Sequence, residues 1–347
     1  MRTRVFAASP TVRCVIARTL GGMAAGEFAA ARWGAASSAA ALIEKAGVSS
    51  LESSDFGTQT PESEFFRSLV DALPFSQGAW RLVPFYRRLL SVTVRPTATW
   101  VGQSKSIRVS KPDILPTSLA PRKYGAITVN TLESFKDPAC EPLIDAELRA
   151  AAVGAVVAAL TDPANAGDAE TPKAITHASV ATNVAATAEP GDDIAAAVAA
   201  FGGDLSQAIW LLDPLSAAQL ALARDAAGNF AFPAIGVRGG SILGAPAFVY
   251  RDVPRDTSGG VIALVDPSGV AYAIESVKIQ RATQTTLELD DQPQGASDTP
   301  VASSATQISL FQNDLVAHKI VATANWETQR PGSVVAIVGA DYATSTS

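Results

Sequence analysis

The sequence predicts an α+β fold, because it combines one long apolar helix with several short strands. Asp137 and Asp162 are each followed by proline, and between them apolar side chains recur at steps of four residues. This spacing predicts a helix over residues 138–161, about 24 residues and about 36 Å long. Its apolar face consists of Ile144, Leu148, Ala152, Val156 and Leu160. The runs Ile209–Leu212 and Ser333–Val338 are continuously apolar, which predicts strands.

A long two-stranded arm is predicted nearer the N-terminus. Leu90, Val92 and Val94 alternate with polar residues. Ile107 and Val109 do the same, so we expect the two runs to pair. Prolines follow the second run, at Pro112, Pro116 and Pro121. So many prolines favour a projecting edge structure over a central sheet.

Shorter patterns predict the remaining elements. A helix that ends before Pro74 is predicted from apolar residues on one face, namely Phe65, Phe66, Leu69 and Val70. Further helices are expected at residues 192–201 and 216–226, and further strands at 124–129, near 248, at 261–265, 272–289 and 307–311. The stretch from there to Ala324 fits either a helix or a strand, and residues 290–306 carry the signals of an exposed loop.

The first 60 residues differ in texture from the rest of the chain. They are rich in Ala, Ser and Gly and hold few large apolar residues, so a tight independent core is not expected there. Residues 27–45 can form an Ala-rich helix. Arginines interrupt the apolar run that a secretory signal requires, which favours a non-targeting extension. No apolar run reaches the roughly 20 residues of a membrane span.

Composition restricts the class of protein. The net charge of −6 argues against a protein whose whole surface binds nucleic acid. Charged residues make up only 17% of the chain, which fits extensive contact between subunits, although an Ala-rich host proteome explains the same bias. Two cysteines, Cys14 and Cys140, exclude a disulfide framework and fit a reducing cytoplasm.

Motifs for catalysis or cofactor binding are not found in the sequence. His177 and His318 are the only histidines, so a three-histidine metal site is excluded and a packed or surface role is expected for His318. The glycines around Ser241 match neither a dinucleotide fingerprint nor a nucleophile elbow and are better explained by a turn entering a strand. The acidic pairs at residues 192–193 and 290–291 are expected to cap helices or to stay solvated.

The densest basic and aromatic cluster is formed by Trp80, Arg81, Tyr86, Arg87 and Arg88. Such a cluster suits contact with nucleic acid or with a neighbouring subunit. A solvated face of a strand or helix explains it equally well.

Three blocks of sequence, in order, resemble the HK97-like major capsid proteins of tailed bacteriophages and prophages. The first is W-V-G-Q-S-K-S-I at 100–107 with L-A-P-R-K-Y-G-A-I-T-V at 119–129, which is similar to the extended loop and its return strand. The second is A-I-W at 208–210 followed by G-A-P-A at 244–247, similar to the axial domain, although L-D-P at 212–214 departs from the usual polar turn. The third is I-S-L-F-Q-N-D-L-V-A at 308–317 with R-P-G-S-V at 330–334, similar to the closing peripheral segment.

The resemblance implies an HK97-like fold with a discontinuous peripheral domain, an axial domain, an extended β-loop and an N-terminal arm. The implied parts are an N-terminal extension at 1–60, which would act as a scaffolding or assembly segment; an N-arm at 61–90; the extended loop at 91–127; the peripheral domain at 128–165 and 270–347, with the spine helix at 138–161; and the axial domain at 166–269.

The implied function is that of a major capsid protein, not an enzyme. Subunits would assemble into the pentamers and hexamers of an icosahedral shell. The shell would enclose double-stranded DNA and would contact it only weakly. A portal, a scaffold or a maturation protease would be further partners, and no cofactor, metal or membrane is implied. The protein would be part of the virion and would assemble in the cytoplasm of the host bacterium. Contacts between subunits through the extended loop would involve Trp100, Lys105, Arg108 and Lys111.

Covalent cross-linking, which some members of this family show, is not expected here. Asn313 matches the asparagine of the cross-link, but Ile320 stands where the assisting glutamate is expected. Alternatives to a viral capsid are an encapsulin-like nanocompartment, a cytoplasmic enzyme with a non-local active site, and a tail or decoration protein.

Overall fold

The computed structural model describes residues 61–94, 98–103, 105–107, 109, 113–134, 137, 140–225, 227–288 and 307–342. The predicted extension at 1–60, including the helix at 27–45, and the predicted loop at 290–306 lie outside these residues. The chain divides into two compact units. Unit 1 comprises the described residues of Met1–Leu69, Tyr124–Ala152 and Ser276–Ala322, and unit 2 those of Val70–Lys123, Val153–Glu275 and Thr323–Ser347.

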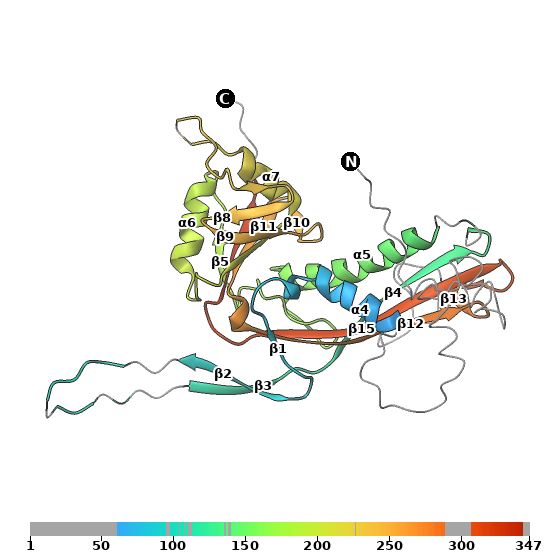
Figure 1. The fold of residues 1–347 in the computed structure, drawn as a ribbon, viewed down its shortest axis with the longest axis horizontal. Helices are drawn as coiled ribbons and strands as arrows, with labels where there is room; N and C mark the ends of the chain where they lie inside the picture. The colour runs from blue at the N-terminus through green and yellow to red at the C-terminus, as the bar shows by residue number, and fades with distance from the viewer. Residues whose placement is uncertain are drawn as a thin grey trace, which may run out of the picture. The chain divides into compact units, whose positions relative to one another are not determined.

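Helices and strands alternate irregularly along the chain, as expected for an α+β protein (Figure 1). The helices are α4 (Pro61–Ala72), α5 (Cys140–Thr161), α6 (Pro190–Ala200) and α7 (Pro214–Leu222), with short 3₁₀ helices η2 (Pro74–Ser76) and η4 (Pro267–Gly269). The first eight strands are β1 (Arg81–Leu82), β2 (Arg88–Val94), β3 (Asp113–Ser118), β4 (Arg122–Thr131), β5 (Thr182–Ala185), β6 (Ile209–Leu212), β7 (Ile235–Gly236) and β8 (Gly239–Ile242). The remaining strands are β9 (Ala245–Val249), β10 (Arg255–Asp256), β11 (Gly259–Val265), β12 (Val270–Ala282), β13 (Thr286–Glu288), β14 (Gln307–Ser309), β15 (Leu315–Thr328) and β16 (Val334–Ala340).

The long apolar helix of the sequence is α5, which has 22 residues and contributes to both units. Its predicted apolar face is buried, as Ile144, Leu148 and Leu160 show. In unit 1 the helix also contacts α4, because the guanidinium group of Arg149 lies 5.6 Å from the ring centroid of Phe65. Asp145 accepts a hydrogen bond of 2.7 Å from the same arginine, one helical turn away.

Unit 2 contains a mixed sheet in the order β5-β16-β11-β6-β9-β8-β7, with β10 paired to β11. The central strand β6 is antiparallel to β11 and parallel to β9, and all four of its residues are buried. Burial on both faces explains why β6, β11 and β16 appear in the sequence as continuous apolar runs instead of alternating ones.

Helices α6 and α7 cover one face of this sheet. Their small and branched side chains, such as Ala197 and Leu220, share a buried cluster with Trp210 of β6, Ile262 of β11 and Ile337 of β16. A second cluster lies on the other face, where Val157 of α5 contacts Val261, Val253 and Ala336. The sheet therefore has a core on each side.

A second sheet has the order β1-β12-β15-β4, and its long strands β12 and β15 contribute residues to both units. The stretch to Ala324, which the sequence left open between helix and strand, belongs to strand β15. Gly125 of β4 lies close to β15, because a Cβ atom at this position would be 2.5 Å from the carbonyl oxygen of Ile320. Glycine is thus required for the close approach of the two backbones.

The predicted two-stranded arm is present, but its second strand was assigned wrongly. Strand β2 pairs with β3, and the register places Leu90 opposite Pro116, whereas Ile107 and Val109 lie in no strand. Among the described residues, this sheet consists of these two strands, so each has an edge that no described strand covers. A proline is tolerated in such an edge strand because its missing N–H can face away from the partner.

Candidate assembly surfaces

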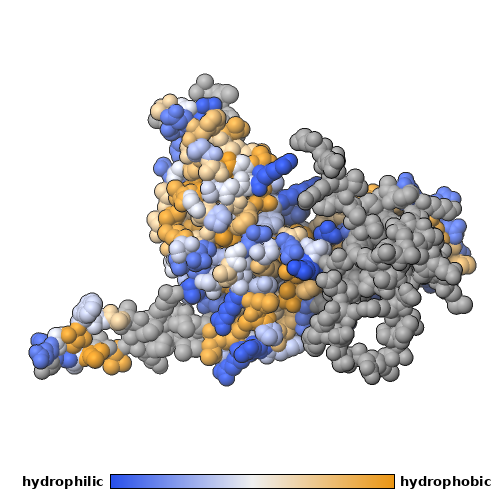
Figure 2. Space-filling view, viewed as in Figure 1, coloured by the Kyte–Doolittle hydropathy of each residue, from blue (hydrophilic) through white to orange (hydrophobic). Residues whose placement is uncertain are grey.

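The segment between β2 and β3, residues 98–109 as far as the structure describes them, carries large apolar side chains that contact no core. Trp100 is fully exposed, with a relative accessibility of 105%, and Val109 reaches 97%. Ile107 is also exposed. Figure 2 shows apolar side chains, in orange, beside hydrophilic ones at the end of this loop. Full burial of each such side chain would contribute about 1.5–3 kcal/mol, so the loop is suited to contact another surface.

The structure places two of the predicted contact residues on this loop. Trp100 and Lys105 are both exposed, and the backbone N–H of Lys105 donates to the carbonyl oxygen of Gly102 over 3.1 Å, which closes a turn. Arg108 and Lys111 lie outside the described residues. Ile107 and Val109 were not predicted as contact residues, because their alternation with polar residues is typical of a strand.

A small core in unit 2 anchors the base of the arm. Leu89 of β2 and Leu119, directly after β3, are buried against Val83 and Ala271. The N–H of Tyr86 donates to the carbonyl oxygen of Leu119 over 2.9 Å. A two-stranded ladder is marginally stable by itself, so the remainder of the arm gains most by packing against a further surface.

Further exposed apolar side chains occur on α7 and in the turns that follow it in unit 2. They are Leu215, Leu222, Phe230, Val237 and Leu243. Leu243 has a φ of 53°, which bulky residues rarely adopt, and it occupies the turn between β8 and β9. The guanidinium group of Arg224 lies 4.5 Å from the ring centroid of Phe230, so this ring is partly covered by a cation.

Buried polar groups hold the connections of unit 2 together. Asp266 is completely buried and accepts hydrogen bonds from the Arg330 side chain (3.0 Å), the Asp204 N–H (3.1 Å) and the Ser268 hydroxyl (2.7 Å). This carboxylate therefore joins the β11–β12 connection to the β15–β16 connection. The ion pair could not be predicted from the sequence, since 64 positions separate Asp266 from Arg330.

A second buried group ties the end of β16 to α6. The hydroxyl of Tyr342 donates to Asp193 over 2.8 Å, and Asp193 also accepts from the N–H and hydroxyl of Thr187. The acidic pair at 192–193 was expected to cap a helix or remain solvated. Asp193 is instead buried in the first turn of α6 and binds groups outside the helix.

His318 takes one of the two roles expected of it, that of a packed side chain. His318 is buried in strand β15, where burial and, to a smaller extent, the positive charge of Arg281 lower its pKa to about 4. His177 is on the surface, with its Nδ1 atom 2.8 Å from the Ser179 hydroxyl. Within the described residues, no three His, Cys, Asp or Glu side chains are grouped so that they could hold a metal ion. Nor is any helix of that part both long and apolar enough to span a membrane.

The basic and aromatic cluster is divided between core and surface. Trp80 is buried and packs edge-on against Phe75, with 5.2 Å between ring centroids. Arg81, Tyr86 and Arg88 are exposed. Trp80 is therefore a core residue and does not stack on a ligand, which leaves only the cations and Tyr86 for an external contact.

Comparison with known proteins supports a single family. The model of the phage capsid family matches residues 82–338. A capsid polyprotein of Pseudomonas phage PAJU2 is 29% identical over 275 residues, which cover 76% of this chain and 40% of that protein. The chain thus spans about two fifths of the length of this curated relative.

Solved structures share the fold. A chain from Gordonia phage Cozz superposes with a TM-score of 0.54 at 16% identity, covering 83% of this chain and 98% of the other. A chain from Mycobacterium phage Adephagia gives a TM-score of 0.53 at 19% identity, covering 78% and 89%. The family match includes the arm, helix α5 and nearly all of the two larger sheets. The chain therefore belongs to the phage capsid family, whose members are structural proteins, and it has the HK97-like fold.

Proposed function

We propose that the chain is the major capsid protein of a tailed bacteriophage or prophage, which assembles through pentamers and hexamers into an icosahedral shell around double-stranded DNA. The observation that carries this proposal is the loop between β2 and β3, where the large apolar side chains of Trp100 and Val109 are almost fully exposed. Such exposed apolar side chains are typical of a surface that binds another protein. Membership of the phage capsid family supports it further.

The contacts of the shell follow from the same loop. Trp100 and Lys105, together with Arg108 and Lys111, would lie on a neighbouring subunit, where the indole loses its contact with water and the cations meet acidic groups. The chain has 33 acidic and 27 basic residues, so acidic partners are plentiful on a second copy. The overall negative charge suits a container that contacts its DNA weakly.

The other assignments complete the proposal. Residues 1–60 would be a scaffolding or assembly extension and 61–90 an N-arm, while the peripheral domain would comprise 128–165 and 270–347 and the axial domain 166–269. A portal, a scaffold or a maturation protease would be partners during assembly in the host cytoplasm, and the mature protein would reside in the virion. No step of this function needs a catalytic residue or a cofactor.

Assembly of purified protein tests the proposal. Wild-type protein and the variants Trp100→Ser and Trp100→Phe would be compared by size-exclusion chromatography and negative-stain electron microscopy. Because Trp100 is fully exposed in the subunit, neither change should alter the unfolding midpoint of the unassembled protein. Wild type and Trp100→Phe should form capsomers or closed shells, whereas Trp100→Ser should remain mostly unassembled.

The comparison between the two variants gives the control, since phenylalanine keeps an apolar ring at the position. Shells of normal yield from Trp100→Ser would remove the loop from the assembly mechanism. A wild-type protein that stays a uniformly small particle under all conditions would contradict the capsid function itself.

A further inference from the structure

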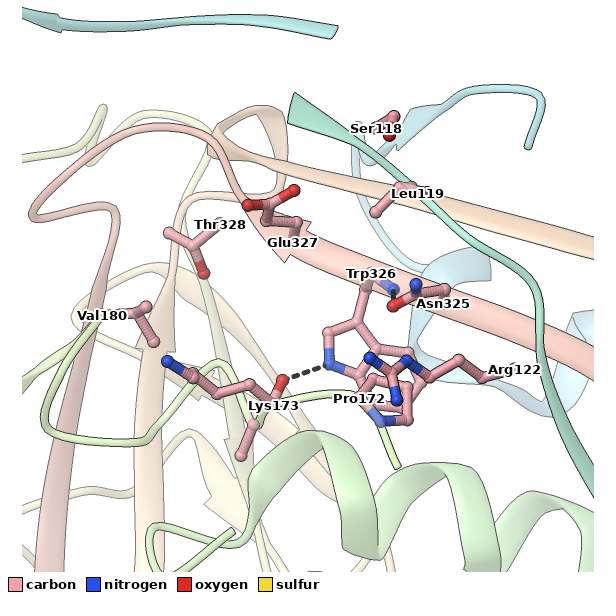
Figure 3. A pocket seen from close by; sticks show the side chains of 11 residues that line it. Ser118, Leu119, Arg122, Pro172, Lys173, Val180, Asn325, Trp326, Glu327 and Thr328 are labelled. Atoms are coloured by element: carbon pink, nitrogen blue, oxygen red, sulfur yellow. Dashed lines mark hydrogen bonds between the residues drawn. The ribbon is translucent and has the colours of Figure 1, made fainter. Parts of the chain in front are cut away.

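Unit 2 contains a polar cavity of about 280 Å³ that the assembly mechanism does not use (Figure 3). It lies where three strands begin or end, at Ser118 of β3, Arg122 of β4 and Thr328 of β15. Lys173, from the segment after α5, completes the wall together with Trp326 and Glu327. Residues far apart in the sequence thus supply cations, a hydroxyl, a carboxylate and an indole to one space.

Hydrogen bonds between these segments hold the cavity open. The indole N–H of Trp326 donates to the carbonyl oxygen of Lys173 over 2.8 Å, as Figure 3 shows. The side-chain amide of Asn325 donates to the carbonyl oxygen of Ala120 over 2.6 Å. Arg122 donates through Nη1 to the carbonyl oxygen of Asp168. The walls are therefore fixed before any ligand enters, which lowers the entropic cost of binding.

Two buried donors in the walls lack an acceptor among the described residues. They are Nε of Arg122 and the hydroxyl of Thr328. A buried donor left without an acceptor costs about 1–3 kcal/mol, so both atoms favour a ligand that supplies lone pairs. To the described part of the chain, the ammonium group of Lys173 donates one hydrogen bond, of 3.2 Å to the Ser179 hydroxyl, which leaves two of its three N–H donors for a ligand.

Charge selects the kind of acceptor. Arg122 and Lys173 bring two positive charges to the lining, and Glu327 brings its one carboxylate. Figure 3 shows Lys173 and Thr328 on one side of Trp326 and Arg122 on the other, so donors are available along the length of the cavity. Several donors with a net positive charge match an anion that has more than one acceptor oxygen.

We propose that this cavity binds an oxyanion, a carboxylate or a phosphate, which accepts hydrogen bonds from Thr328, Lys173 and Arg122. The anion comes either from solution or from an acidic side chain of a second copy of the chain. Glu327 weakens the site because its carboxylate repels the ligand. Burial raises the pKa of Glu327, and a hydrogen bond from Thr117 and the charge of Lys173 act in the opposite direction.

Fluorine NMR of the full-length, unassembled protein labelled with 5-fluorotryptophan tests the site directly. The signal of Trp326, assigned with the variant Trp326→Phe, would be followed while inorganic phosphate or acetate is added at constant ionic strength. Wild type should show a saturable shift. Thr328→Val should weaken binding about tenfold, the effect of losing one hydrogen bond to a charged ligand. Glu327→Gln should strengthen binding several-fold.

The choice of variants separates binding from folding. Valine matches threonine in shape, and the Thr328 hydroxyl makes no hydrogen bond within the described residues, so the unfolding midpoint of Thr328→Val should equal that of wild type. Arg122→Gln, which removes a positive charge from the lining, should also weaken binding; Arg251→Gln is its matched control and should bind as wild type does, because Arg251 is exposed and does not line the cavity. A wild-type signal without saturation, or an equal response from Thr328→Val and wild type, would overturn the proposal.

Assembled shells then identify the source of the anion. A Trp326 signal that matches the anion-bound position and ignores added phosphate assigns the ligand to an acidic side chain of a second copy. A signal that still responds to phosphate assigns it to the solution. This experiment on assembled shells rests on the proposed capsid function, whereas the titration of the unassembled protein does not. Failure of the anion site is therefore distinguishable from failure of the capsid function.

Discussion

Removal of the carboxylate of Asp266 should destabilise unit 2 more than any other single polar change in this network. The side chain is completely buried and accepts four hydrogen bonds, from the Arg330 side chain, the N–H and hydroxyl of Ser268, and the N–H of Asp204. Asp266→Ala leaves these donors without their acceptor and opens a small void. Loss of one partner from a buried ion pair costs about 3–5 kcal/mol, and we expect a value in that range.

The neighbouring residues give a graded series. Arg330→Gln should cost about 1.5–3 kcal/mol, because Asp266 keeps its other donors while the side chain of Arg330 is about one-third exposed (32%) and already partly solvated. Ser268→Ala removes one hydroxyl donor and should cost about 1 kcal/mol. The double variant of Asp266→Ala with Arg330→Gln should be little less stable than Asp266→Ala alone, since both changes remove the same ion pair.

Urea denaturation of the unassembled protein measures the series. Tryptophan fluorescence is a suitable signal, because Trp80, Trp210 and Trp326 are buried in unit 2. The order of midpoints, with Asp266→Ala lowest and Ser268→Ala highest of the variants, is the expected result. A loss below about 1 kcal/mol for Asp266→Ala would refute the reasoning, as it would mean that the freed donors reach water or other acceptors without cost.

Three further predictions rest on other buried groups. His318 has a folded-state pKa of about 4 against 6.5 in the unfolded chain, so the unfolded state binds more protons between these two values, and the free energy of unfolding should fall by about 3 kcal/mol as the pH drops through that window. Urea midpoints measured across pH 4–7 should lose this pH dependence in His318→Gln, and an unchanged dependence would exclude His318 as its cause. Tyr342→Phe should lower the free energy of unfolding by about 1.5–3 kcal/mol, because Asp193 loses a buried hydrogen-bond donor. Thermal unfolding at neutral pH measures the loss, and a midpoint equal to that of wild type would show that the hydroxyl contributes nothing. Gly260→Ala should lower the free energy of unfolding by about 1–3 kcal/mol through overpacking, since its Cβ would lie 2.3 Å from Oδ1 of Asp213 and 2.6 Å from the Ser216 hydroxyl. Urea denaturation measures the loss, and Gly191→Ala, whose Cβ would have no atom within 4 Å, is the control.

Local patterns were sufficient for most elements of the fold. Helix α5 was predicted because apolar residues at steps of four form a face within one segment. Strands β6, β11 and β16 were predicted from continuous apolar runs, since strands buried on both faces have no polar side. The family resemblance was carried by short blocks whose order survives even at low identity, and it led to the family and to the proposed function, which the chemistry of single residues could not indicate.

Tertiary structure alone decided which segments meet. The partner of β2 is Asp113–Ser118 because pairing depends on register between separated strands, and the alternation at Ile107 and Val109 is too short to specify it. Residues 315–324 became strand β15 only by pairing in a sheet, as their pattern also fits a helix. Asp266 with Arg330, and the cavity around Trp326, are assembled from chain segments many positions apart, for which no spacing in the sequence exists. Periodicity reports which side of an element is buried, whereas long-range pairing is a property of the folded chain, where the entropy of bringing distant segments together is offset by burial.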